Sequence, residues 1–550
     1  MRGLERARWA VGVASIALLA TACGGGDDDN AGGSGGDSAG GPSGTVTIQN
    51  GEPQNPLVGF NTNETEGGLV VDSITTGLVE YDVEDGSPVM AVAESIETDD
   101  NTTYTVTLKD WTFHDGSPVT ANSFVDAWNY GAYGPNAQLN SYFFEPIQGY
   151  TEVQGEDANG DETITADEAP VTEMSGLKVV DDKTFTITLT APASSFINRL
   201  GYSAFVPLPE SFFEDPEAYG EEPVGNGPFR FVSWDHDVQI DVEAWEDYPG
   251  ERPAQVQAVQ FKVYTDSDAA YADLTSGNLD IVDTLPTSAL AGEQFKSDLG
   301  EGRYVEQPEG VFQSFTLPQY LPEYADPNLG KALSLAIDRE SITQTIFNGG
   351  RTPATGWVAP VVEGYVEGQC GEFCTYDPAK AKEYFAQTDF QGPLTIGYNA
   401  DGDHKAWVDA TCNSIKNAIG LDCQGQPTPD FATFREAITN REEDGAFRTG
   451  WQMDYPSIEN FLAPLYATGA SSNDGEYSNP QFDQLLQQAA SAEGEESLEL
   501  YQQAERLLAE DMTVIPLWYS TLQAGWSERL ENVRFTPFGT PDLQGITVSE

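Results

Sequence analysis

Hydrophobic and polar positions along this chain follow two different periods, and these periods predict its strands and helices. Residues 45–49 and 104–108 alternate one by one, as half-buried strands do. Residues 69–79 follow a helical period, and Thr120 can cap a further helix with an apolar face. Helices that alternate with strands in this way are typical of α/β lobes.

The same alternation continues through the second half of the chain. Residues 271–279 predict a helix that leads into a strand over residues 280–284. Residues 497–510 are amphipathic, and residues 514–519 form an apolar run that predicts a buried strand. A chain of 550 residues is too long for one compact core, so we expect two or three domains.

The chain is strongly acidic, with 89 Asp and Glu against 25 Lys and Arg and a formal net charge of −64. Binding to phosphates requires clustered basic side chains, so the composition excludes nucleic acid as a partner. The same charge disfavours adsorption to anionic lipid, so attachment to a membrane would require an anchor.

The N-terminus has the pattern of an export signal over residues 1–22. Arginines precede an apolar run over residues 9–20, which is too short to span a bilayer. The run ends in LATAC, which resembles a bacterial lipobox and implies cleavage before Cys23 and lipidation of that residue. Ordinary signal cleavage that leaves a free Cys is the alternative. Residues 23–44, rich in Gly, Ser and Asp, predict a flexible tether next to the anchor.

Four further cysteines remain, and they allow three pairings. An oxidising exterior favours disulfides, and only three His in the chain make a zinc site a poor alternative. We favour the two local pairings, Cys370 with Cys374 and Cys412 with Cys423.

The stretch FRTGWQMDYP, residues 447–456, combines a cation, a broad aromatic ring and a carboxylate. In an extended segment, one face holds Arg448, Gly450 and Gln452, and the other holds Thr449, Trp451 and Met453. We interpret the stretch as a strand edge that receives a peptide-like ligand. Asp454 would bind a ligand ammonium and Arg448 a ligand carboxylate. A core Trp beside a surface ion pair is the alternative.

Several stretches together resemble the oligopeptide- and dipeptide-binding family, the large solute receptors of bacterial ABC importers (extracellular solute-binding protein family 5). They occur in order along the chain: WTFHDGSPVTA at 111–121, GNGPF at 225–229, KALSLAIDRESI at 331–342, YDPAKA at 376–381 and the stretch 447–456. In this family the segments at 331–342 and 376–381 are a helix and a helix start.

The resemblance implies an α/β, periplasmic-binding-protein-like fold of two lobes, with mixed sheets and a ligand cleft between the lobes. It also implies three domains. The implied ranges are 45–76, 196–305 and 521–550 for the first domain, 77–195 for an inserted second domain and 306–520 for the third.

The resemblance also implies which residues bind the ligand. Asp454 would bind the α-ammonium of a peptide, and Arg448 would face its carboxylate end. The ligand backbone would pair with Gly450, Trp451 and Gln452 as an added strand. The opposite edge of the site would be formed by Asn63, Glu64 and Thr65, with Tyr142 contributed by the second domain.

One acidic stretch falls outside this pattern. DANGDETITADE, residues 157–168, resembles an EF-hand calcium loop, but Glu162 stands where the sharp turn requires Gly. An acidic surface loop is the alternative, and we assign no metal ligand.

The sequence therefore predicts a monomeric, lipid-anchored receptor on the extracellular face of the cell membrane, without enzymatic activity or cofactor. It would close over a peptide and deliver it to the permease of an ABC importer. A receptor of the same fold for another solute, such as an oligosaccharide, a nickel chelate or an opine, is the first alternative. A secreted hydrolase is the second, although no nucleophile elbow or zinc-protease motif is present.

Overall fold

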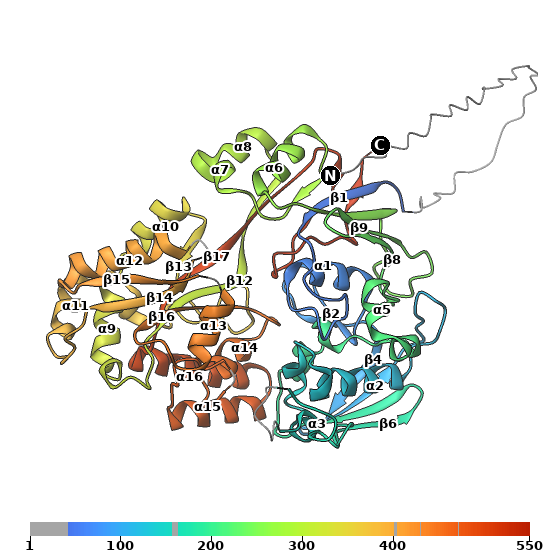
Figure 1. Ribbon diagram of the computed structural model, residues 1–550, viewed down its shortest axis with the longest axis horizontal. Coiled ribbons are helices and arrows are strands. Elements are labelled where there is room, and N and C mark those ends of the chain that lie inside the picture. The colour runs from blue at the N-terminus through green and yellow to red at the C-terminus, as the bar shows by residue number, and fades with distance from the viewer. Residues whose placement is uncertain (1–41, 157–162, 401–403, 430, 471, 550) are drawn as a thin grey trace, which may run out of the picture. The chain divides into compact units, whose positions relative to one another are not determined.

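One long mixed sheet organises the computed structural model, which describes residues 42–156, 163–400, 404–429, 431–470 and 472–549 (Figure 1). Its strands run in the order β15-β14-β16-β12-β17-β11-β1-β10-β9-β8, and β13 pairs with β17. Their bounds are β1 (Thr45–Asn50), β8 (Phe229–Asp235), β9 (Gln239–Ala244), β10 (Ala258–Val263), β11 (Ile281–Val282), β12 (Tyr304–Thr316), β13 (Arg351–Pro353), β14 (Leu394–Asn399), β15 (Cys423–Thr428), β16 (Ala446–Gln452) and β17 (Val514–Trp526).

Two long strands join the halves of this sheet. β12 and β17 have 13 residues each and pair antiparallel from Tyr304 and Gly525 to Thr316 and Val514, with an irregularity between Pro308 and Phe312. In Figure 1 they run between the yellow-to-red elements and the blue and green elements. One hydrophobic core lies around β1 and a second around β14 and β16.

Helices cover both halves. Those of the first half are α1 (Thr65–Ile74), α5 (Pro216–Glu221), α6 (Ser267–Ser276), α7 (Thr287–Leu290) and α8 (Gln294–Leu299). Those of the second half are α9 (Pro327–Leu335), α10 (Arg339–Phe347), α11 (Pro378–Phe385), α12 (His404–Ile419), α13 (Phe431–Thr439), α14 (Ile458–Tyr466), α15 (Pro480–Ser491) and α16 (Gly494–Asp511). In the second half, α12 packs along β15, and α15 packs against α16.

A separate four-stranded sheet has the strand order β4-β5-β7-β6. In sequence, its strands follow β1 and precede β8 of the large sheet. With the short strands and helices near it, its elements are β2 (Val79–Tyr81), β3 (Pro88–Met90), β4 (Ala93–Thr98), β5 (Thr103–Leu108), β6 (Leu177–Asp181), β7 (Thr184–Thr188), α2 (Ala121–Ala132), α3 (Tyr150–Gln154) and α4 (Phe196–Arg199). Its core is rich in aromatic side chains, including Phe124, Trp128 and Phe185. The domain boundaries given above stay predictions.

Strand pairs and one ion pair connect the two ends of the described chain. β1 lies between β10 and β11, β11 pairs with β17, and β18 (Leu530–Glu531) pairs with β19 (Thr547–Val548). The Arg529 guanidinium donates to both carboxylate oxygens of Asp280, at 2.6 and 2.7 Å, and also to the carbonyl of Thr45. Asp280 is only 3% exposed, so its carboxylate is buried beneath the Arg529 side chain.

Most predicted elements are present, and two predictions were wrong in their bounds. The helix predicted at 69–79 is α1, which ends at Ile74 because the amides of Asn226 and Gly227 donate to the Ile74 carbonyl, at 3.0 and 2.8 Å. Val79 instead begins β2. The single helix expected at 331–342 is split into α9 and α10. Asp338 starts α10 by accepting a hydrogen bond from the Ser341 amide, at 3.1 Å.

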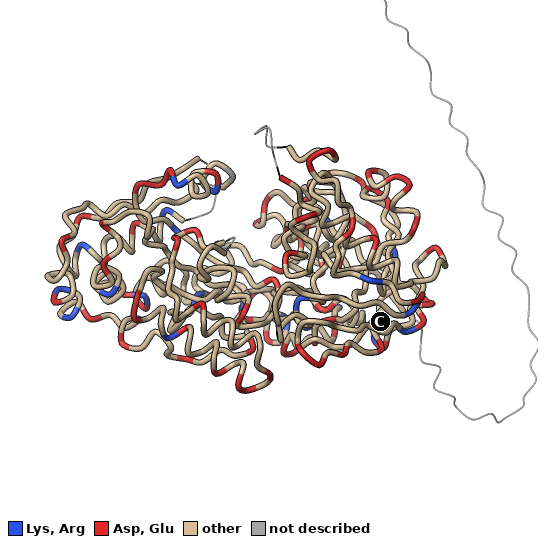
Figure 2. Tube along the Cα trace, turned by 90° about the horizontal axis from the view of Figure 1, so that it is seen from below, with Lys and Arg blue, Asp and Glu red and all other residues tan. Residues whose placement is uncertain are grey.

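The structure pairs Cys370 with Cys374 and Cys412 with Cys423, as the sequence predicts. Asp and Glu far outnumber Lys and Arg over the chain, as Figure 2 shows. Within the described ranges, no helix has the length and apolar character that a membrane crossing requires. The predicted signal peptide, Cys23 and the first half of the calcium-loop candidate, residues 157–162, lie outside the described residues.

Candidate ligand-binding cleft

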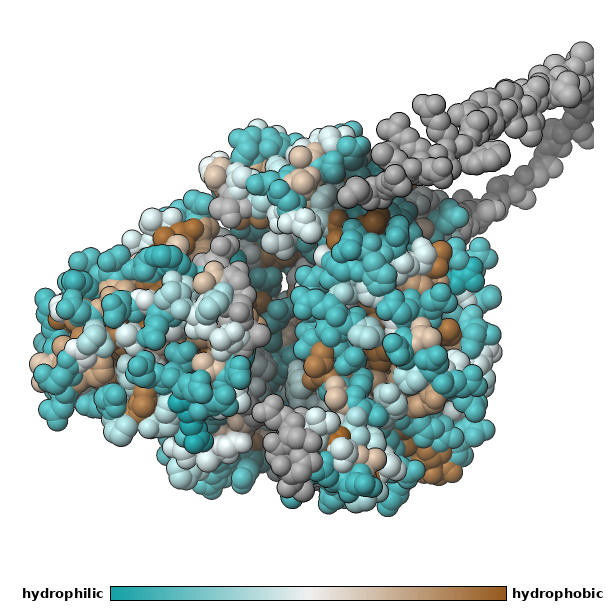
Figure 3. Space-filling model, viewed as in Figure 1, coloured by the Kyte–Doolittle hydropathy of each residue, from teal (hydrophilic) through white to brown (hydrophobic). Residues whose placement is uncertain are grey.

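A cleft of about 520 Å³ lies where several separate parts of the chain meet. One wall comes from α1, the loop before it and β2; others come from the end of β16 and from residues 536–544, and further lining residues lie at 140–142, 201–206, 228–229 and 252. Figure 3 shows the surface hollowed between the elements of the first half and those of the second. The cleft is lined by both polar and aromatic side chains, as ligand sites commonly are.

The residues predicted for the site divide between this cleft and a neighbouring pocket. Those that line the cleft are Asn63, Glu64, Thr65, Tyr142, Gln452 and Asp454. The other three, Arg448, Gly450 and Trp451, line a pocket of about 280 Å³ further back along β16. The structure therefore divides the nine residues between two cavities, which share β16 as a wall.

Asn460 on α14 fixes the end of β16. Its Oδ1 accepts hydrogen bonds from Trp451 Nε1 and from the Asp454 amide, both at 3.0 Å. Its Nδ2 donates to Asp454 Oδ2 at 2.9 Å. Because Asn460 is only 1% exposed, these bonds hold the Trp451 ring and the Asp454 carboxylate rigidly in relation to each other.

The Asp454 side chain is partly buried, and among the described residues no Lys or Arg forms an ion pair with its carboxylate. Burial raises the pKa of this carboxyl from its usual value to about 6. The hydrogen bond from Asn460 and the charge of Arg199 oppose that rise, and the charge of Glu459 adds to it. A ligand ammonium would lower this pKa by stabilising the ionised form.

Arg199, at the end of α4, lies beside this segment. Its Nη2 donates to the Tyr455 hydroxyl at 2.8 Å and lies 3.9 Å from Glu459 Oε1. Its guanidinium also lies 5.2 Å from the centre of the Tyr455 ring. The Tyr455 hydroxyl in turn donates to Glu459 Oε2 at 2.7 Å. The Arg199 guanidinium is therefore bonded to Tyr455 and Glu459 rather than to Asp454.

One edge of β16 is open where it reaches the ligand residues. β12 pairs with β16 from Phe447 to Gln452 on one side. On the other side, β14 pairs only with Ala446 and Phe447. In the described chain, no strand continues that ladder along residues 448–452. The outward amide and carbonyl groups there can accept an added strand.

The close packing of β12 explains why a glycine stands at position 450, without reference to a ligand. A Cβ at this position would lie 3.1 Å from the carbonyl oxygen of Phe312 on β12. That distance is tighter than an ordinary contact, so the glycine accommodates the neighbouring strand.

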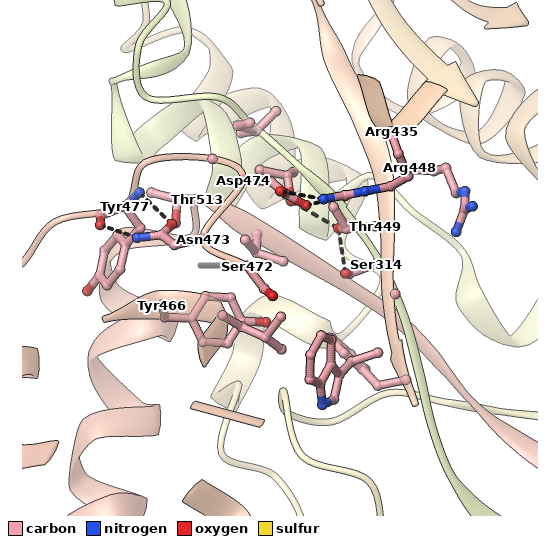
Figure 4. A pocket seen from close by; sticks show the side chains of 18 of the residues that line it. Ser314, Arg435, Arg448, Thr449, Tyr466, Ser472, Asn473, Asp474, Tyr477 and Thr513 are labelled. Atoms are coloured by element: carbon pink, nitrogen blue, oxygen red, sulfur yellow. Dashed lines mark hydrogen bonds and ion pairs between the residues drawn. The ribbon is translucent and has the colours of Figure 1, made fainter. Parts of the chain in front are cut away.

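The smaller pocket holds two arginines in different settings (Figure 4). Arg435 pairs with both oxygens of Asp474, at 2.6 and 3.0 Å. Arg448 donates from Nε to Asn399 Oδ1 at 2.8 Å, and its guanidinium lies over the rings of Phe431 and Phe434, at 5.2 and 5.5 Å. The Arg448 guanidinium thus has a fixed place in the wall of this pocket.

On the opposite wall, Glu64 shapes the loop before α1. Its carboxylate accepts hydrogen bonds from Asn55 Nδ2 at 2.8 Å and from the Gln54 amide at 3.1 Å. Asn63 and Thr65 are exposed beside it, and Tyr142 is 44% exposed, so it is not the core aromatic that the sequence left open.

The sequence analysis missed several residues of the cleft. Asp72, Glu80, Tyr81 and Tyr202 all line it, although no local motif marks them. Of these four, only Asp72 could have been noticed in the sequence, because it is a charged residue inside the largely apolar helix α1. Among the described residues, no group of three or more His, Cys, Asp or Glu side chains is arranged to hold a metal ion.

Comparison with known proteins places this geometry in context. A family model described as "Bacterial extracellular solute-binding proteins, family 5 Middle" matches residues 87–473. The oligopeptide-binding protein OppA of Bacillus subtilis is 25% identical over 545 residues, which covers 96% of each chain.

Two solved structures share the fold. The murein tripeptide binding protein MppA of Escherichia coli has a TM-score of 0.73 at 22% identity, covering 92% of this chain and 98% of that one. OppA of Haemophilus influenzae, in complex with RPPGFSPFR, has a TM-score of 0.71 at 21% identity, covering 92% and 99%. The predicted α/β, periplasmic-binding-protein-like fold is confirmed.

Proposed function

This chain belongs to family 5 of the bacterial extracellular solute-binding proteins, and from that premise we propose that it binds peptides in the cleft and delivers them to an ABC importer. The observation that carries the proposal is the open edge of β16, which leads directly to the Asp454 carboxylate. An open strand edge recognises the main chain of a peptide, and a carboxylate at its end recognises the free amino terminus.

The ligand runs along residues 448–452 with its amino terminus at Asp454. Main-chain hydrogen bonds to this edge provide affinity for any sequence, because every peptide carries the same amide groups. The Trp451 ring flanks the path, and Arg448 lies towards the carboxylate end of the ligand.

The opposite wall supplies the second set of contacts. Asn63 and Thr65 offer polar groups on the loop before α1, and Tyr142 offers a ring and a hydroxyl. Because these residues and Asp454 lie on different walls of the cleft, a bound peptide that contacts both would draw the walls together.

The cellular setting follows from the N-terminal pattern. The chain is exported, cleaved before Cys23 and held at the outer face of the membrane by a lipid on that residue, as a monomer. Two local disulfides fit an oxidising exterior.

Isothermal titration calorimetry with trialanine, N-acetyl-trialanine and a cello-oligosaccharide tests the function. We expect trialanine to bind at one site, and acetylation to weaken binding by about 1.5–3 kcal/mol, the scale of a hydrogen bond to a charged group. Equal binding of both peptides removes the assignment of Asp454, and binding of the sugar alone overturns the peptide assignment.

A further inference from the structure

Two of the hydrophobic cores meet at Tyr455, one residue after Asp454. The Tyr455 side chain is 1% exposed and belongs to the aromatic core of the four-stranded sheet, together with Phe196 of α4. The nearest core residues on either side of it in sequence, Met453 and Ile458, belong instead to the core around β14 and β16. The Tyr455 side chain therefore crosses from one core into the other.

A connected set of hydrogen bonds fixes the Tyr455 hydroxyl. It accepts a hydrogen bond from Arg199 Nη2 at 2.8 Å and donates one to Glu459 Oε2 at 2.7 Å. The same Glu459 oxygen accepts a hydrogen bond from the Ser195 hydroxyl at 3.3 Å, and Glu459 Oε1 lies 3.9 Å from Arg199 Nη2. Arg199 and Ser195 belong to the chain around α4, and Tyr455 and Glu459 belong to the segment that begins α14. These contacts therefore tie the two segments together.

The charged groups of this cluster are largely removed from water. The side chains of Arg199 and Glu459 are 18% and 15% exposed. Hydrogen bonds with a charged partner are stronger than neutral ones, and removing one partner of a buried pair is costly because the other charge is left alone. When the two segments separate, however, both charges regain water, which limits the net stability of the contact. The cluster can therefore hold the two segments together and still release them.

A backbone contact beside this cluster joins the same two parts of the chain. The Ser194 amide donates to the carbonyl of Ala490 on α15, at 3.0 Å. The amide of the preceding residue, Ala193, donates instead to the carbonyl of Asn101 just before β5, at 2.8 Å. Two consecutive amides thus report on different contacts. Ala193 reports on the packing around the four-stranded sheet, and Ser194 reports on its contact with α15.

The same short segment of chain carries the Asp454 carboxylate. Glu459 and Asn460 are consecutive residues of α14, and Glu459 accepts the hydrogen bond from Tyr455, whereas Asn460 donates to Asp454. A movement of α14 away from α4 would therefore also move the Asp454 carboxylate relative to the other walls of the cleft.

We propose that Arg199, Tyr455 and Glu459 form a latch that holds α14 against α4 in the absence of ligand, and that opening of this latch limits the release of a bound solute. Because the latch favours the closed arrangement before a ligand arrives, less of the binding free energy of the ligand is used to close the cleft. The first part of the inference is independent of the solute, and the second part rests on the proposed function.

Hydrogen exchange of the unliganded protein, resolved to single amides by mass spectrometry with electron-transfer fragmentation, tests the latch. The variants are Tyr455→Phe, which keeps the buried ring and removes the hydroxyl, and Glu459→Gln, which keeps the shape and removes the charge. Tyr264→Phe is the matched control. The Tyr264 hydroxyl also donates to a carboxylate, Asp273 Oδ2 at 2.8 Å, and Tyr264 lines neither the cleft nor the smaller pocket.

The Ser194 amide should exchange slowly in wild type and Tyr264→Phe, and at least about tenfold faster in both latch variants, since losing a charge-assisted hydrogen bond lowers the cost of local opening. The Ala193 amide should exchange alike in all four proteins. The latch is excluded if Ser194 exchanges in wild type as fast as an unstructured amide, or if Glu459→Gln leaves its rate unchanged. If Tyr455→Phe also speeds exchange at Ala193, the core itself has loosened, and Glu459→Gln alone decides.

Stopped-flow displacement of bound trialanine, followed by tryptophan fluorescence, measures the second part. Glu459→Gln should release trialanine at least about threefold faster than wild type and Tyr264→Phe, because affinity changes of this kind reside mainly in the dissociation rate. Unchanged release, with faster exchange at Ser194, overturns the second part and leaves the latch. If trialanine does not bind, the proposed function and the second part fail together, while the exchange experiment still decides the latch.

Discussion

Replacing Asp454 with Asn tests the most specific part of the proposed chemistry. The amide has the same shape, and its oxygen can still accept the hydrogen bond from Asn460 Nδ2, so the end of β16 should keep its structure. The change removes a charge-assisted hydrogen bond to the ligand ammonium, worth about 1.5–3 kcal/mol. Trialanine should therefore bind about 10 to 150 times more weakly to this variant at pH 7.

The pH dependence of binding gives a second, independent measure. The free carboxyl of Asp454 has a pKa of about 6, raised by burial, and only its ionised form binds the ammonium. Lowering the pH from 7 to 5 takes the ionised fraction from about nine-tenths to about one-tenth, so wild-type affinity should fall roughly tenfold. Asp454→Asn has no carboxyl at this position and should show a flat profile.

Calorimetry at several pH values, with trialanine as ligand, measures both effects. Asp126→Asn, which changes an exposed aspartate on α2 that lines neither cavity, serves as the control and should behave like wild type. The reasoning is refuted if Asp454→Asn binds as tightly as wild type, or if the tenfold fall with pH persists in that variant.

Three further changes test other parts of the structure. Asn460→Leu removes the bonds to Asp454 and to the Trp451 ring, so it should weaken trialanine binding at least about tenfold and move the midpoint of the pH profile upward, as calorimetry would show. Glu505 is 1% exposed, and burial raises its pKa to about 7, so its native form binds a proton more tightly than the unfolded chain does, and the stability it contributes is lost as the pH rises from about 4 to 7. Glu505→Gln should therefore raise the melting temperature at pH 8 but not at pH 4, and unchanged melts at pH 8 would contradict this. Replacing both Cys412 and Cys423 with Ala should lower the free energy of unfolding by about 2–4 kcal/mol in urea titrations.

Local signals predicted the fold well where the cause is local. Thr120 begins α2 and forms a reciprocal capping box with Ser123, which needs only residues a few positions apart. The two disulfides also join cysteines that lie close in sequence. The break between α9 and α10 was missed, although the cap that Asp338 provides for α10 is local, and a distant contact also holds the chain there. Arg339 is 2% exposed and donates from Nε to the carbonyl of Pro516, which is 177 residues away.

The same distinction between local and distant causes holds for the residues of the site. The stretch around Asp454 carries its chemistry in ten consecutive residues, so sequence alone identifies it as a candidate. Arg199 contacts Tyr455 in that stretch from 256 residues earlier, and Asp72 lines another part of the cleft. Neither lies in a motif, because only the folded chain brings each of them to the site.

The contacts of Arg529, which forms an ion pair with Asp280, also bear on the order in which parts of the fold can form during synthesis. The same guanidinium bonds to Thr45, whose codon is translated 484 residues earlier. At a rate of about 5–20 residues per second, roughly 25 to 100 seconds separate the appearance of these two partners on the ribosome. β1 is therefore synthesised early, but its contact with Arg529 can form only near the end of synthesis. The buried residues of the core around β14 and β16, by contrast, all lie in one uninterrupted stretch of the chain that runs from β12 to β17.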